Sequence, residues 1–273
     1  GDVAHGSPTV SSFVWPEIWR GNDMNAVVGN LSLVMLAYCC AAVFIAGLIR
    51  GYCGFGFSAL VVASLTLVLP PVEVIPFVFM LEIAASVGML PTVWRSVDRR
   101  LLGWLLAGYV IGAPLGLYAL IQMDQAVVRI IISVIILVIS IALLRGFVFR
   151  AANYAVSIFT TGSVAGAVNG VSAVGGLPVV LLMLANNAPA TVTRASIVAF
   201  LMLGNIYATA FTFGSGIITA DVMIRFAIFL VPMALGVVFG SRQFLRSSPE
   251  SFKALALWLL IGLASLGLLR LAF

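Results

Sequence analysis

The sequence predicts an all-α polytopic membrane protein made of two inverted repeats of five hydrophobic segments, about ten segments in all. Sixty-three per cent of the 273 residues are hydrophobic and eight per cent are charged. The mean hydropathy is +1.21. A soluble protein of this length needs a charged surface, so the outer surface here is expected to face lipid.

Eight stretches are mainly apolar over roughly the ~20 residues that a transmembrane helix needs. They span about 26–49, 72–93, 101–121, 125–146, 155–171, 190–213, 222–243 and 252–272. Two shorter, glycine-broken stretches, about 52–69 and 172–188, lie between them. Residues 1–24 are polar and lack the basic start and cleavage site of a signal peptide. We therefore expect a polar N-terminal segment (1–24), a first transmembrane repeat (25–150) and a second transmembrane repeat (151–273).

The two predicted repeats share an internal pattern. Residues 50–71 align without a gap on 169–190, which matches three conspicuous pairs: Gly51 with Gly170, Gly56 with Gly175, and Pro70 with Pro189. Further along, Gly112 and Gly116 match Gly236 and Gly240. A glycine break, a short apolar segment and a proline follow in the same order in both halves, which indicates a duplication.

Loop charges indicate that the two halves have opposite orientations. If both short stretches cross the membrane, ten Lys and Arg residues fall on one side and four on the other; if both are re-entrant, the division is eight against six. The positive-inside rule therefore favours ten crossings with both termini outside, although the sequence leaves the re-entrant alternative open. Loop 94–100 is basic, whereas its counterpart 214–221 has no Lys or Arg. Inverted repeats are common in secondary transporters.

The two glycine breaks are the candidate site. A helix that restarts after such a break points free N–H groups and the positive end of its dipole into the protein, which favours an anion. Tight helix packing is the alternative, and we prefer it for Gly112, Gly116, Gly236 and Gly240. The predicted substrate-binding residues are Arg50, Gly51, Cys53, Gly54, Phe55, Gly56, Phe57, Asn169, Gly170, Ser172, Gly175, Gly176, Arg194 and Asn205.

Two of the charged residues inside predicted crossings are candidates for function. Glu82 is near the middle of 72–93, where a carboxylate is costly unless it is paired, hydrated or protonated. It is predicted to couple transport to protons; the alternatives are a partner for an arginine and a protonated acid that is hydrogen-bonded to a neighbouring helix. Arg194 lies one turn inside its crossing, and snorkelling to the interface is as plausible there as substrate contact.

Other function classes find little support. His5 is the sole histidine, which excludes a histidine-based metal site or catalytic dyad, and no nucleophile–base pair predicts an enzyme. No cofactor and no metal are expected. The dispersed arginines argue against nucleic-acid binding. The expected partners are a small anionic substrate and the lipid bilayer, and a homodimer is left open.

The glycine-rich openings 51–57 and 170–178, each followed by a short apolar run and a proline, resemble those of the sulfite exporter TauE/SafE family, also called the 4-toluene sulfonate uptake permease family. The run Val97-Asp98-Arg99 and the segment 112–116 add to the resemblance, which covers about 26–272. The family often has three successive glycines in each opening, whereas this chain has Gly54-Phe55-Gly56 and Gly175-Gly176-Leu177. The resemblance implies an inner-membrane permease for sulfur-containing anions such as sulfite, sulfonates or sulfoacetate.

The predicted function is therefore a secondary transporter that moves such anions by alternating access, with protons as the coupling ion. An anion channel of the same fold is the alternative. Saturation of the flux and a requirement for a proton gradient separate the two. A structural subunit is disfavoured, because a scaffold has no need of duplicated breaks.

Overall fold

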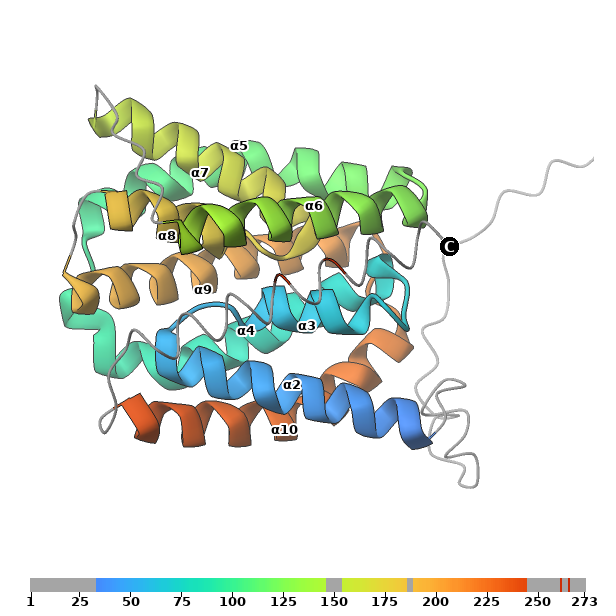
Figure 1. Ribbon diagram of the computed structural model, residues 1–273. Coiled ribbons are helices and arrows are strands. Elements are labelled where there is room, and N and C mark those ends of the chain that lie inside the picture. Colours follow the sequence, from blue (N-terminus) through green and yellow to red (C-terminus); the bar gives the residue numbers. More distant parts are fainter. Residues whose placement is uncertain (1–32, 146–153, 186–188, 245–260, 262–264, 266–273) are drawn as a thin grey trace, which may run out of the picture.

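The computed structural model describes residues 33–145, 154–185, 189–244, 261 and 265 (Figure 1). These residues form helices, and no strand occurs among them, which confirms the all-α prediction for this part of the chain. The elements are α2 (Leu33–Cys53), α3 (Phe57–Leu65), α4 (Pro71–Val93), the 3₁₀ helix η1 (Trp94–Ser96), α5 (Arg99–Gln122), α6 (Gln125–Leu144), α7 (Tyr154–Ser172), α8 (Gly176–Ala185), α9 (Ala190–Gly214) and α10 (Ala220–Phe244). The polar segment 1–24 lies outside the described residues, and so does the predicted crossing 252–272 except for residues 261 and 265.

Six of these helices are long and apolar enough to cross a membrane: α2, α4, α5, α6, α9 and α10. They correspond to six of the eight long stretches that the sequence predicts. The predicted crossing 155–171 is also helical, as α7, which contains glycine, serine, threonine and asparagine residues and is not among these six. The chain is thus a multi-pass membrane protein by length and composition of its helices.

The two short helices follow the two glycine breaks. α3 has 9 residues and α8 has 10, so at a rise of 1.5 Å per residue each is about 14–15 Å long. That is about half of a hydrocarbon core of ~30 Å. Neither helix spans a bilayer alone. In Figure 1, α3 turns back from the end of α2 toward the side on which α2 begins.

Helix boundaries recur after a shift of 119 residues, which is the shift that aligns 50–71 on 169–190. The shift relates the end of α2 at Cys53 to the end of α7 at Ser172. It also relates the starts of the short helices, Phe57 and Gly176, and the starts of α4 and α9, Pro71 and Ala190. Pro70 and Pro189 cap the third helix of each set. Gly54 and Ala173, related by the same shift, both have positive φ, 81° and 56°. The two breaks therefore share a left-handed residue at this position, whereas Gly56 has a φ of 91° and its equivalent Gly175 is not among the residues with positive φ.

Glycines hold α5 against α7. A Cβ atom on Gly112 would lie 1.9 Å from the carbonyl oxygen of Ser163, and one on Gly116 would lie 2.0 Å from that of Ala167. Because no carbon atom can approach an oxygen so closely, only glycine permits this backbone contact. The packing role predicted for these two glycines is confirmed.

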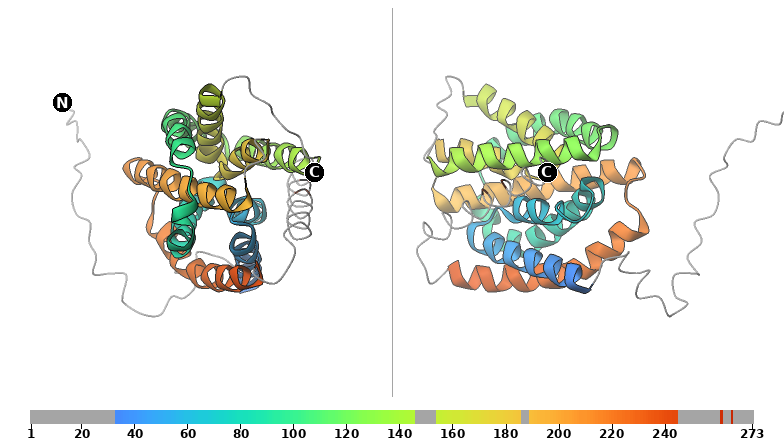
Figure 2. Two further views of the ribbon diagram at one scale, coloured as in Figure 1. Left: turned by 90° about the vertical axis from the view of Figure 1, so that its left-hand side faces the viewer. Right: turned by 45° about the vertical axis from the view of Figure 1, so that its right-hand side comes forward.

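The same kind of contact joins α2 to α10. A Cβ atom on Gly236 would lie 2.4 Å from the carbonyl oxygen of Phe44, and one on Gly240 would lie 2.0 Å from that of Leu48. The packing prediction for this pair is confirmed as well. The end-on view in Figure 2 places α2 with α10 on one side of the bundle and α5 with α7 on the other.

α4 and α9 lie between these two glycine-packed pairs and contact each other (Figure 1). In the apolar window of α4, 61% of the residues are buried, against 28% in α10, so α4 is a central helix and α10 a peripheral one. α4 and α9 run in opposite directions. The connection 94–98 and the connection 215–219 consequently lie at opposite ends of the bundle in Figure 1.

Candidate functional site

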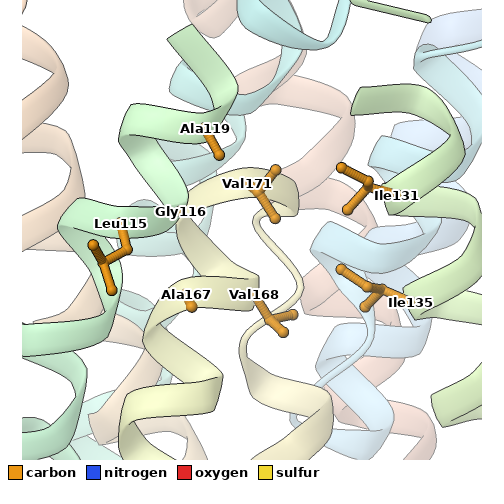
Figure 3. A pocket seen from close by; sticks show the side chains of 8 residues that line it. All are labelled: Leu115, Gly116, Ala119, Ile131, Ile135, Ala167, Val168 and Val171. Carbon is orange, nitrogen blue, oxygen red and sulfur yellow. The ribbon is translucent and has the colours of Figure 1, made fainter. Parts of the chain in front are cut away.

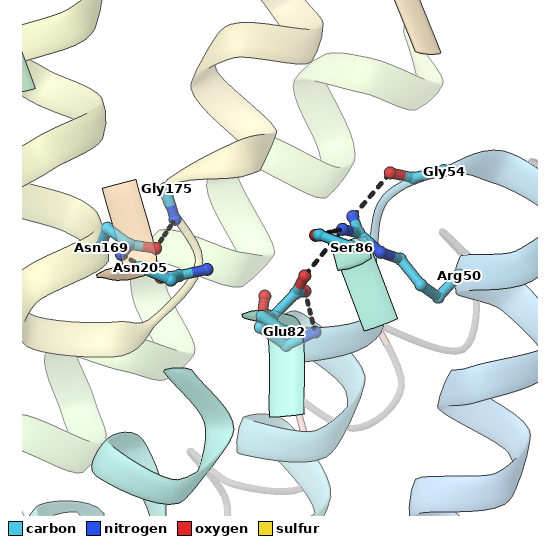
Figure 4. Close-up of polar contacts among 8 residues, drawn as sticks. Arg50, Gly54, Glu82, Ser86, Asn169, Gly175 and Asn205 are labelled. Atoms are coloured by element: carbon cyan, nitrogen blue, oxygen red, sulfur yellow. Dashed lines mark hydrogen bonds and ion pairs between the residues drawn. The ribbon is translucent and has the colours of Figure 1, made fainter. Parts of the chain in front are cut away.

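The first glycine break is held by a buried arginine. α2 ends just before Gly54, and Gly54 and Gly56 have φ angles of 81° and 91°, in the left-handed region that favours glycine. Arg50, in the last turn of α2, donates from Nη1 to the Gly54 carbonyl oxygen at 2.6 Å and from Nη2 to Ser86 Oγ at 2.8 Å. The arginine therefore ties the break to the middle of α4 (Figure 4).

Glu82 completes this cluster. Its Oε2 lies 2.9 Å from Arg50 Nη2, and the exposed fractions of the two side chains are 1% and 0%. Its Oε1 accepts a hydrogen bond of 3.3 Å from the backbone N–H of Ser58, in the first turn of α3. The carboxylate thus sits at the N-terminus of the short helix, where the dipole favours negative charge. Of the alternatives raised by the sequence, a partner for an arginine is the contact that the structure contains.

A fully buried ion pair in this position has strict energetic requirements. Removing two charges from water costs several kcal/mol per ion, and their attraction offsets that cost only with good geometry and further hydrogen bonds. Both conditions are met, because Arg50 also binds Gly54 and Ser86, and Glu82 also binds Ser58. Neither charge can be lost alone without leaving the other uncompensated.

The second break is held by amides. Gly175 N–H donates to Asn169 Oδ1 at 3.0 Å, which fixes the orientation of that amide. Asn169 Nδ2 then donates to Asn205 Oδ1 at 2.9 Å and to the Tyr109 hydroxyl at 2.7 Å. The Asn205 oxygen is thereby committed as an acceptor. The side-chain nitrogen of Asn205, Nδ2, is buried and has no hydrogen-bond partner among the described residues. In the view of Figure 4 this nitrogen points from the second cluster toward the first.

The two clusters occupy equivalent positions. Arg50 and Asn169 are related by the shift of 119 residues, and so are Ser86 and Asn205. Both hydrogen bonds, Arg50 to Ser86 and Asn169 to Asn205, span 36 residues. Position 82 shifts to Leu201, whose side chain lies against Gly176. The first cluster therefore carries both charges of a buried ion pair, whereas the second is neutral.

Arg194 reaches the first break from α9. Its Nη2 donates to the Gly51 carbonyl oxygen at 3.0 Å. Its side chain also fills the space beside Gly54, where an added Cβ atom would lie 2.6 Å from Arg194 Cγ. The side chain is partly buried and engaged by the protein, so it contacts the predicted site directly and does not extend freely to the interface. A residue of the second half thus covers the break of the first half.

Several predicted site residues have packing contacts. Added Cβ atoms on Gly51 and Gly170 would lie 2.2 Å from the Val237 carbonyl oxygen of α10 and 2.5 Å from the Ala113 carbonyl oxygen of α5. Ser172 donates to the carbonyl oxygen one turn earlier in α7. The remaining predicted residues lie at or just after the breaks: Gly56, Phe57 and Gly176, with Phe55 partly buried. The side chain of Cys53 lies outside the described part of the structure. Substrate contact by these residues stays a prediction.

Ser58, Ser86 and Tyr109 belong to the two clusters, but sequence reasoning did not select them. A signal existed for Ser86, because the alignment of 50–71 on 169–190, continued at the same shift, pairs Ser86 with Asn205. Ser58 acts through its backbone N–H, which no side-chain pattern reveals. Tyr109 is an aromatic residue among apolar ones in α5, and its buried hydroxyl contact depends on the approach of α7.

An apolar groove of about 270 Å³ lies apart from these clusters, between α5, α6 and α7 (Figure 3). It is lined by Leu115, Gly116, Ala119, Ile131, Ile135, Ala167, Val168 and Val171. None of these side chains offers a charge or a hydrogen-bond donor to an anion. The groove suits hydrocarbon and is not part of the candidate site.

A family model described as sulfite exporter TauE/SafE matches residues 39–266, most of the chain. The chain belongs to this family. This match confirms the resemblance noted in the sequence. The matched range includes both glycine breaks, both polar clusters, and all six candidate crossings except the first residues of α2. No curated protein and no solved structure matches the chain.

Members of the TauE/SafE family are membrane transporters for sulfite and related sulfur anions. Membership and the six long apolar helices together make this chain a multi-pass membrane transporter, consistent with the inner membrane. In this TauE/SafE protein the charged and amide side chains at membrane depth gather at the two breaks and the central helices α4 and α9.

Proposed function

We propose that this protein is a secondary transporter that moves small sulfur oxyanions or sulfonates across the inner membrane by alternating access. The observation that carries the proposal is the pair of equivalent helix breaks, each opening onto a short helix and each joined to a central helix by a buried polar side chain. Backbone N–H groups at such helix starts favour anions. The substrate class comes from the family.

The proposed anion site lies between the two clusters. Within the two clusters, Arg50 Nε and Asn205 Nδ2 are buried nitrogen donors with no hydrogen-bond acceptor among the described residues. Unsatisfied donors at membrane depth cost free energy that a bound anion would recover. Gly56 has open space beside it, since an added Cβ atom would meet only Ile49 Cγ2, at 3.6 Å. These features support a site that also includes the start of α3.

Substitution of Asn205 tests this site. Asn205→Asp keeps the shape of the side chain and the acceptor for Asn169 but places a carboxylate where the free donor is. At an effective dielectric constant of 20, two like charges some 4 Å apart repel by about 4 kcal/mol. We therefore expect binding of the anion to weaken by roughly tenfold or more.

Calorimetric titration of the purified protein with sulfite, sulfoacetate, taurine, sulfate and methanesulfonate measures the effect. Asn205→Ser is the matched control, since it has no charge and carries the side chain found at the equivalent position 86; it should lose less affinity than Asn205→Asp. Wild-type affinity in Asn205→Asp, with normal elution in gel filtration, would remove Asn205 from the site.

We also propose that the two halves are inverted repeats of five segments, ten in all, in which the short helix of each half takes part in the second passage through the membrane. The common shift of the helix boundaries, the opposite directions of α4 and α9, and the mirrored loop charges support this arrangement. The domain division at about 150, with a first repeat over 25–150 and a second over 151–273, is part of the same proposal.

Surface labelling tests the topology. Ser96 and Ser215 are exposed and lie in equivalent connections, and cysteine differs little from serine in size. In a background without Cys39, Cys40 and Cys53, we expect an impermeant maleimide to label Ser96→Cys only from the cytoplasmic side and Ser215→Cys only from the outside. The basic residues around Ser96 give this direction through the positive-inside rule. Labelling of both from one side would contradict the inverted repeat.

An anion channel of the same fold remains the competing function. A channel needs no coupling carboxylate and conducts without saturating at low substrate concentration. In proteoliposomes, a transporter should give saturable uptake that an imposed pH gradient accelerates. Uptake that stays linear in substrate concentration and does not depend on the pH gradient would favour the channel.

A further inference from the structure

Glu82 occupies the position that an anionic substrate would take. Its carboxylate lies 2.9 Å from the Arg50 guanidinium and accepts the backbone N–H of Ser58 at the start of α3. A guanidinium and a helix N-terminus are the groups that bind sulfonate, sulfate or sulfite oxygens in proteins. The second cluster has no carboxylate at the equivalent position, which is Leu201. The protein therefore holds an anion of its own at the charged break.

We propose that Glu82 and the substrate anion exchange on Arg50 and the Ser58 N–H, and that Glu82 leaves only when it takes up a proton. One proton then binds with each anion. This inference rests on the proposed function, since it assigns the coupling step at the same site. No bond other than the O–H bond of the carboxyl group forms, and the proton comes from solvent on the side open to the substrate.

Charge balance explains why the proton is required. Arg50 and Glu82 are 0% and 1% exposed and together carry no net charge. An anion that bound Arg50 beside an ionised Glu82 would place two negative charges on one buried guanidinium, in a medium of low dielectric constant. For a monoanionic substrate, protonation of Glu82 leaves the total charge of the Arg50 cluster unchanged, because Arg50 then pairs with that anion. The protonated carboxyl keeps one donor and one acceptor for Ser86 and neighbouring backbone groups.

The other ionisable groups near this cluster are engaged elsewhere. From α9, Arg194 binds the Gly51 carbonyl oxygen; from α10, Arg225 pairs with Glu73, more than two turns before Glu82 on α4. From α6, Arg129 binds the Leu69 carbonyl oxygen. Tyr109 of α5 binds Asn169, and Tyr52 of α2 is buried two residues beyond Arg50. α3 contributes only serine and apolar side chains. Glu82 is thus the carboxylate placed to exchange with the anion.

The exchange has a defined pH dependence. If the complex binds one more proton than the empty protein, the affinity for the anion rises as the pH falls, by about tenfold per pH unit. A carboxylate that stays ionised and paired with Arg50 throughout would give an affinity independent of pH.

Wild-type protein in detergent micelles tests the exchange without any substitution. The probe is whichever of sulfoacetate, taurine, sulfate and methanesulfonate binds most tightly, since sulfite itself exchanges a proton with solvent near neutral pH. Calorimetry in two buffers of different ionisation enthalpy counts the protons taken up, and sulfate and methanesulfonate do not themselves titrate near neutral pH. We expect one proton per anion, and infrared difference spectra should gain the C=O band of a protonated carboxyl group when the anion is added.

Two variants on the same helix assign the proton. Glu82→Gln should abolish the infrared band and the proton uptake, and its affinity should lose the tenfold change per pH unit. Glu73→Gln is the matched control, because Glu73 is also paired with an arginine on α4 but is remote from the break; it should behave like wild type. If Glu82→Gln does not fold, the number of protons that wild-type protein and Glu73→Gln take up with each anion still tests the exchange.

The outcomes separate the two proposals. Binding without proton uptake, or a band that persists in Glu82→Gln, overturns the exchange and leaves the transport of sulfur anions standing. Failure of every probe to bind the folded wild-type protein overturns the proposed function, and the exchange falls with it.

Discussion

Replacing Arg50 by glutamine should lower the free energy of unfolding by about 3–5 kcal/mol, because it leaves the buried charge of Glu82 without a partner. The substitution also removes the hydrogen bonds that fix Gly54 and Ser86. Chemical unfolding in mixed detergent micelles, followed by tryptophan fluorescence, measures the change.

A double-mutant cycle distinguishes a lost ion pair from lost packing. Arg50→Gln combined with Glu82→Gln removes both charges and keeps similar volumes, so it should recover most of the stability that Arg50→Gln loses. Arg225→Gln is the control, because its partner Glu73 is 40% exposed and such pairs contribute about 0–1 kcal/mol. Equal losses in Arg50→Gln and Arg225→Gln would contradict the buried-pair interpretation.

The second large effect is expected at the interface of α5 with α7. Gly112→Ala adds a carbon atom that would lie 1.9 Å from the Ser163 carbonyl oxygen, so the two helices must separate. Overpacking of this kind costs 1–3 kcal/mol and occasionally more, and a backbone atom cannot move aside like a side chain; we expect about 3 kcal/mol or more.

Gly103→Ala provides the comparison on the same helix. Nothing lies within 4 Å of an added Cβ atom there, and alanine favours the helix over glycine by up to about 1 kcal/mol. The melting temperature of Gly103→Ala in detergent should therefore equal or exceed that of wild type, while that of Gly112→Ala falls. Similar melting temperatures for the two variants would show that α5 and α7 do not depend on close backbone contact.

Much of the fold could be predicted from composition and from the repeat. Apolar length identifies the six long helices, and the glycine break followed by proline identifies where α3, α8, α4 and α9 begin. The role of each glycine, in helix packing or beside open space, could not be predicted from the sequence. Gly51 and Gly56 belong to one motif, yet Gly51 packs against α10 and Gly56 has open space beside it. The residue type is the same in both roles, and only the neighbouring backbone distinguishes them.

The candidate site was predictable in its parts but not in its connections. Glu82 was selected as a carboxylate at membrane depth, and Arg50, Asn169 and Asn205 as candidate substrate-binding residues. That Arg50 and Glu82 form an ion pair depends on the turn at Gly54, which brings the end of α2 against the middle of α4. Hydrophobic pattern carries no information about that turn angle. The separation of 36 residues relates Arg50 to Ser86 and Asn169 to Asn205, so it was a clue to those two hydrogen bonds and not to the ion pair.

The pairing of α2 with α10 sets the order in which this chain can assemble during synthesis. α10 begins at Ala220, 167 residues after α2 ends at Cys53, so at a ribosomal rate of ~5–20 residues per second α2 waits on the order of ten to thirty seconds for its partner. The α5–α7 interface closes much earlier. Throughout the interval, Gly47 and Gly51 of the inserted α2 present a small-residue surface to lipid. Among the described helices, assembly therefore ends with α2, which is made early, docking onto α10, which is made late.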